Sequence, residues 1–73
     1  MRTSTIRIAA HDLTKAGFNA NQPYEACDPI AYALDDKAAV KARVNADSMT
    51  LTVEVNTNQL LDAATTLREL GLI

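Results

Sequence analysis

The sequence predicts an α+β fold in which a three-stranded antiparallel sheet carries two main helices on one face. Three stretches alternate apolar and polar residues with the period of two that strands show. Two other segments space their apolar residues by three and four, which is typical of amphipathic helices. A chain of 73 residues has room for one hydrophobic core, so residues 1–73 are expected to form a single domain.

The first strand is expected over residues 3–9, where Ile6 and Ile8 alternate with polar and small neighbours. In the stretch that follows, 10–17, apolar residues stand three apart and Gly17 provides a C-terminal stop. This stretch therefore predicts one or two helical turns. Residues 18–27 lack periodicity and contain Asn, Gln and Pro, so they are predicted to form a loop.

The first main helix is predicted to begin at Asp28. Aspartate is a favoured N-cap, and Pro29 suits the first helical position. The helix is expected to end near Lys37 or Ala39. Its inward stripe has the spacing i, i+3, i+4 and consists of Ile30, Ala33 and Leu34.

A hairpin and a last helix complete the chain. Strands are predicted over 40–44 and 49–55, joined by the turn residues 45–48. Asn56 or Thr57 is the expected cap of the last helix, with Gln59 completing a capping box if Asn56 is the cap. Gly71 is expected to end this helix. Its inward stripe is predicted to consist of Leu60, Ala63, Ala64, Leu67 and Leu70.

The connections predict the sheet order. A crossover joins the first and second strands, whereas the hairpin makes the second and third strands antiparallel. The simplest sheet therefore has the order 1-3-2, because the third strand is the most β-branched and carries no proline. An order with the second strand in the centre is the alternative. With the order 1-3-2, the βαββα chain resembles a ferredoxin-like fold without its last strand.

The composition favours a small binding domain over an enzyme. The single cysteine, Cys27, excludes a disulfide scaffold, and no apolar run is long enough to cross a membrane. One cysteine and one histidine do not make a zinc site, so neither a metal nor another cofactor is expected. Cys27 lies at a predicted helix start, which would lower its thiol pKa. No spacing brings Cys27 or Ser48 to His11, so no catalytic residue is predicted.

An acidic surface with exposed tyrosines is the candidate binding site. At about 100° per residue, the predicted first helix points several polar side chains outward, opposite its inward stripe. Residues 23–36 contain four acids and no base, whereas residues 37–43 contain three bases and no acid. An ordinary solvated helix face would show the same pattern. The candidate partner-binding residues are Tyr24, Glu25, Asp28, Tyr32, Asp35 and Asp36.

The open sheet face offers an alternative surface. Arg7, Lys41 and Arg43 are predicted to point outward from it, and cations on a sheet can meet phosphates. Sheet modules that bind single strands also stack bases on aromatic residues, and the predicted face has none. Nucleic acid is therefore the alternative partner, and a protein is the expected one. The chain is expected to be a monomer or a weak homodimer.

Two stretches of the sequence resemble a pattern found in a group of small proteins. Residues 5–16, Thr-Ile-Arg-Ile-Ala-Ala-His-Asp-Leu-Thr-Lys-Ala, and residues 26–34, Ala-Cys-Asp-Pro-Ile-Ala-Tyr-Ala-Leu, resemble small phage proteins. Those proteins run strand, short helix, loop, Cys-Pro-Val/Ile-Ala-x-Ala-Leu and another strand. The match spans about residues 5–55 and departs at Asp28, which stands between Cys27 and Pro29.

A small, mildly acidic chain without catalytic residues is also similar to anti-CRISPR proteins. That resemblance implies an inhibitor that binds a Cas subunit, for example of a Cascade-type complex, in the cytoplasm of the bacterial host. Such an inhibitor would block DNA recognition by covering its partner.

Overall fold

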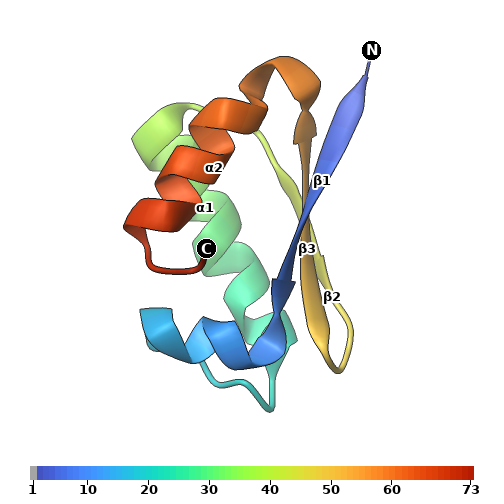
Figure 1. The fold of residues 1–73 in the computed structure, drawn as a ribbon, viewed down its shortest axis with the longest axis vertical. Coiled ribbons are helices and arrows are strands. Elements are labelled where there is room, and N and C mark those ends of the chain that lie inside the picture. Colours follow the sequence, from blue (N-terminus) through green and yellow to red (C-terminus); the bar gives the residue numbers. More distant parts are fainter. Residues whose placement is uncertain (1) are drawn as a thin grey trace.

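The computed structural model describes residues 2–73, which form a three-stranded sheet with helices on one face (Figure 1). The strands are β1 (Thr3–Ala9), β2 (Arg43–Ala46) and β3 (Thr50–Asn56). β3 lies in the centre and is antiparallel to both neighbours, which gives the order β1-β3-β2. The predicted α+β fold and sheet order are confirmed, and the order with the second strand in the centre is wrong.

Two α-helices and three short 3-10 helices connect and cover the strands. α1 (Cys27–Ala38) lies against β2, and α2 (Leu60–Glu69) packs against α1 and β3. The two helices run in opposite directions over the same face of the sheet (Figure 1). Within residues 2–73, no helix has the length and apolar character that crossing a bilayer requires. The 3-10 helices are η1 (Ala10–Ala16), η2 (Pro23–Ala26) and η3 (Thr57–Gln59).

The core lies between the sheet and the helices. Along β3, burial alternates strictly, because every second side chain of a strand points to the same face. The opposite face of the sheet is left without a helix over it (Figure 1). The fully buried large side chains are Ile8, Leu13, Ile30, Leu34, Val40, Leu51, Val53, Val55, Leu67 and Leu72.

The segment before α1 is more ordered than the predicted loop. Pro23 and Ala26 are buried, and η2 leads directly into the first turn of α1. α1 therefore begins at Cys27, one residue before the predicted start, and Ala26 precedes it in a helical conformation. Asp28 is not an N-cap, but it lies in the first helical turn, where its negative charge is favourable.

The hairpin is shifted along the chain relative to its prediction. β2 covers 43–46 instead of 40–44, because Val40 is buried at the end of α1 and its N–H is bonded to the Leu34 carbonyl. The turn consequently moves to residues 47–49. The Asp47 carboxylate closes this turn by accepting hydrogen bonds from the backbone N–H groups of Met49 and Thr50, at 2.8 and 2.7 Å. Met49, which was expected to begin the next strand, lies in the turn instead and is 75% exposed.

α2 begins later than predicted. Residues 57–59 form η3, and within the described chain Asn56 makes no side-chain cap bond, so the predicted capping box is absent. The Gln59 amide instead donates to the Ala39 carbonyl at 3.5 Å. At the other end, Gly71 adopts a positive φ of 84° just after the helix, as a stop signal should.

Candidate protein-binding surface

The outer side of α1 carries four of the predicted partner-binding residues. Asp28, Tyr32, Asp35 and Asp36 have the spacing i, i+4, i+7, i+8, which places them on one stripe of a helix. All four are exposed, and Tyr32 is 75% exposed. The orientation follows from the other side of α1, where Ile30 and Leu34 are fully buried against the sheet.

The other two predicted residues, Tyr24 and Glu25, belong to η2. Buried Pro23 and Ala26 hold this short helix in place, which leaves Tyr24 63% exposed. The Gln22 amide, oriented with its nitrogen toward Glu25, donates to the Glu25 carboxylate at 2.6 Å. No spacing or motif in the sequence indicates this contact. The six residues therefore lie on two consecutive elements, and we refer to them together as the acidic tyrosine face.

The carboxylates of the acidic tyrosine face have no cationic partner within the described chain. The ion pairs among residues 2–73 involve two other acids. Asp12 Oδ1 lies 3.2 Å from Lys15 Nζ, and Glu54 pairs with Arg43. The next base along the chain, Lys37, lines a groove between α1 and α2 instead. The charge of this face is therefore not neutralised by neighbouring side chains, and it is available to a cationic partner.

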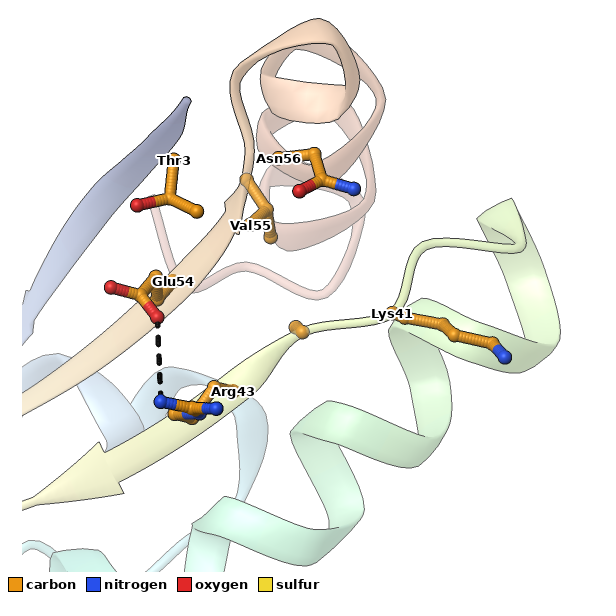
Figure 2. Close-up of a pocket in the computed structure, with 7 residues that line it drawn as sticks. Thr3, Lys41, Arg43, Glu54, Val55 and Asn56 are labelled. Carbon is orange, nitrogen blue, oxygen red and sulfur yellow. Dashed lines mark ion pairs between the residues drawn. The ribbon is translucent and has the colours of Figure 1, made fainter. Parts of the chain in front are cut away.

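The three cations of the alternative surface do not act as one cluster. Arg7 lies on β1 opposite Thr52, whereas Arg43 lies on β2 with its Nη1 4.0 Å from Glu54 Oε1. Lys41 lies before β2, so its predicted place on the sheet is wrong. Figure 2 shows the cleft at this point, where the Lys41 side chain points away from Arg43 and Glu54.

The open sheet face is polar and without aromatic side chains. The exposure pattern of the three strands, each described in full, assigns their alternate residues to this face. A stacking platform for bases is therefore missing from it. Its residues are Thr3, Thr5, Arg7, Ala9, Arg43, Asn45, Thr50, Thr52, Glu54 and Asn56.

Cys27 has the properties of a structural thiol. It is half-buried against the core, and this burial raises the pKa of its thiol. The neighbouring Asp28 carboxylate raises that pKa further. The expectation that the helix start would lower this pKa is wrong, because burial and the nearby negative charge both disfavour the thiolate.

His11 and Ser48 line the same surface pocket, although the sequence spacing did not bring them together. No hydrogen bond between them is present among residues 2–73, and His11 Nε2 instead lies 3.3 Å from Asp12. The backbone N–H groups of Met49 and Thr50, next to Ser48, are already bonded to Asp47. Within the described residues, His11 and Ser48 therefore do not form the base–nucleophile bond that acyl transfer uses.

Across residues 2–73, no three His, Cys, Asp or Glu side chains gather where they would hold a metal ion.

One exposed apolar residue was not among the predicted surface residues. Leu61 is 78% exposed on α2. The signal for it was present, because at about 100° per residue Leu61 lies well off the predicted inward stripe of this helix.

Comparison of the chain with protein-family models, with curated proteins and with solved structures found no match.

Proposed function

We propose that this protein is a small inhibitor that binds a basic surface of another protein through the acidic tyrosine face. One observation carries the proposal: two exposed tyrosines lie on η2 and α1 with four carboxylates that have no cationic partner among residues 2–73. Tyrosine is enriched among the residues that dominate binding energy at interfaces. Carboxylates of one sign steer a partner of opposite charge and fix its orientation.

The partner is a protein whose cations normally meet DNA phosphates. The resemblance to phage proteins and to anti-CRISPR proteins narrows this class to a Cas subunit, and we propose a Cascade-type effector complex in the bacterial host cell. The net charge of −2 is small, so the whole molecule does not imitate DNA. The protein instead covers the DNA-binding surface of its partner. The charge of the acidic tyrosine face attracts that surface, and the bulk of the rest of the domain keeps DNA away from it.

The test is a comparison of two matched double variants. Tyr32→Ala with Asp35→Lys removes one exposed ring and reverses one charge on the acidic tyrosine face. Leu61→Ala with Asp62→Lys makes the same kinds of change on α2, where both residues are also exposed. Both variants change the net charge equally, so general charge effects cancel between them.

We expect the wild-type protein and the α2 variant to bind a purified Cascade-type complex and to prevent it from binding target DNA. The α1 variant should lose about tenfold or more in affinity, since a hot-spot residue contributes about 2 kcal/mol. Equal affinity of all three proteins would refute the site. Failure of the wild-type protein to affect DNA binding would refute the Cas target.

Nucleic-acid binding remains the alternative function, and a gel shift at low salt separates it from the proposal. We expect no shift with single-stranded or double-stranded nucleic acid. A shift that Arg7→Glu with Arg43→Glu abolishes would support the alternative, because phosphate binding depends on cations and on salt.

A further inference from the structure

β1 forms a free edge of the sheet whose backbone groups can pair with another strand. Its register against β3 is continuous from Thr3 to Ala9. At the two ends, Ala10 N donates to Met49 O at 2.8 Å and Thr57 N donates to Arg2 O at 3.1 Å. Hydrogen-bonded pairs alternate along an antiparallel ladder. The backbone N–H and C=O groups of the even-numbered residues of β1 are therefore the ones that bond to β3. The N–H and C=O groups at the free edge are therefore those of Thr3, Thr5, Arg7 and Ala9.

The other edge of the sheet is much less suited to pairing. β2 has only four residues. Just after it, Asp47 N donates to Thr50 O at 2.9 Å, so the backbone groups of the odd-numbered residues of β2 are the ones that bond to β3. Only Val44 and Ala46 of β2 then direct backbone groups outward. Natural proteins blunt free edges with short strands, proline or lysine. β2 is short in this way, whereas the seven residues of β1 include neither proline nor lysine.

We propose that β1 pairs with β1 of a second copy of this chain, antiparallel and centred on Ile6, to form a continuous six-stranded sheet. This register overlaps all seven residues of both strands. It opposes Thr3 to Ala9 and Thr5 to Arg7 of the other copy, and it opposes Ile6 to itself. Every outward N–H and C=O group of both edges then has a partner.

The side chains of the open face favour this register over its neighbours. Arg7 of one copy faces Thr5 of the other, and Thr5 lies beside Glu54 on β3, so the guanidinium group is one strand away from a carboxylate. A shift of two residues one way opposes Arg7 to Arg7, and like charges directly opposite each other are destabilising. A shift of two residues in the other direction opposes Ile6 to Ser4, so the apolar contact between the Ile6 side chains of the two copies is lost.

The covered face at the same edge is apolar around Ile6, whereas Ser4 near its end is polar and bonds to Thr57. Residues of α2 that line the groove with α1, including Asp62 and Thr66, mark the side of α2 that faces α1. At about 100° per residue, Leu60 and Ala64 lie on the side of α2 that faces away from α1. Both are half-buried, as is Ile6 of β1. Pairing two copies brings these side chains from both molecules to one seam, where they can complete their burial.

Analytical ultracentrifugation from about 10 µM to about 1 mM tests the pairing, a range that covers weak association. We expect the mass to rise with concentration from 7.9 kDa toward twice that value. Thr5→Pro removes an outward N–H of β1 and should weaken the dimer about tenfold or more. Ala46→Pro is the matched control, because it removes an outward N–H of β2, and its dimer should equal that of the wild type.

Two results would overturn the pairing. A wild-type monomer at every concentration would leave the β1 edge to a strand of another protein, and a dimer sensitive to Ala46→Pro alone would place the contact at β2. Circular dichroism of each proline variant shows whether it is folded.

Cysteine cross-linking in a Cys27→Ser background tests the register independently. Ile6 opposite Ile6 is a pair without backbone hydrogen bonds, where the Cα atoms approach to about 4.5 Å, within disulfide range. Ile6→Cys should therefore form a covalent dimer on mild oxidation, and Thr5→Cys should not. Cross-linking of Thr5→Cys instead would overturn the register centred on Ile6. This inference does not depend on the proposed function, because the acidic tyrosine face lies on α1 and η2.

Discussion

Ala39→Gly should stabilise the fold, because Ala39 has a left-handed backbone conformation that favours glycine. Ala39 has φ 54° and ψ 34° at the C-terminal end of α1. Its N–H is bonded to the Asp35 carbonyl at 3.1 Å, and that of Val40 to the Leu34 carbonyl at 3.1 Å. These bonds, together with the full burial of Val40, hold an alanine in a conformation that costs about 1–2 kcal/mol.

Glycine removes this cost but loses more entropy on folding, by about 0.4–1 kcal/mol. The net gain in the free energy of unfolding is about 0.5–1 kcal/mol. For a domain of this size, that gain corresponds to a rise in Tm of about 2–8 °C.

Thermal unfolding followed by circular dichroism measures the effect, with Ala38→Gly as the control. Ala38 is the last residue of α1, has an ordinary helical backbone and packs against the core. Glycine there should lower the free energy of unfolding by about 1 kcal/mol or more. Two adjacent, chemically identical substitutions are therefore expected to have opposite signs. A Tm for Ala39→Gly that equals or falls below that of the wild type would refute the reasoning.

Two further predictions follow from the pKa values. Hydrogen bonds from the N–H groups of Met49 and Thr50 hold the pKa of Asp47 below its ordinary value of 3.8. A lowered pKa stabilises the fold above pH 3.8 and ceases to do so as the pH falls through the folded value. The Tm difference between wild type and Asp47→Ala should therefore shrink below pH 3.8; a constant difference would contradict the role of the charge. Burial, with Asp28 beside it, raises the pKa of Cys27, so iodoacetamide at pH 8 should alkylate the folded protein more slowly than the protein in urea. Equal rates would contradict the protection of this half-buried thiol by the fold.

Periodicity predicted the elements well, whereas tertiary contacts decided their ends. Alternation over β3 and helical spacing over α1 follow from which side of each element is buried, and the sequence records that directly. The start of α1 depends on η2, which buried Pro23 and Ala26 hold in place. The start of β2 depends on Val40, whose burial ends α1 before the strand can begin. Such contacts join segments distant in sequence, and no local pattern encodes them.

The candidate site was predictable to the same degree and for the same reason. The helical angle between Ile30 and Tyr32 was sufficient to place Tyr32 and the three aspartates outside. The contact of Gln22 with Glu25 required the local turn of η2, which the loop prediction omitted. The position of Lys41 followed the predicted strand and was wrong because the strand begins later.

The proposed dimer would also change how the acidic tyrosine face meets a partner. α1 lies over β2, at the opposite end of the sheet from the free edge of β1 (Figure 1). Pairing through β1 keeps the helices of both copies on the same face of the six-stranded sheet, so two acidic tyrosine faces remain accessible at its two ends. A partner assembled from repeated subunits then meets two binding faces on one rigid body. The second contact forms at a high effective concentration, which strengthens binding without adding any residue to the site. A Thr5→Pro variant would consequently retain the affinity for one isolated subunit and lose the additional affinity for a repeated array.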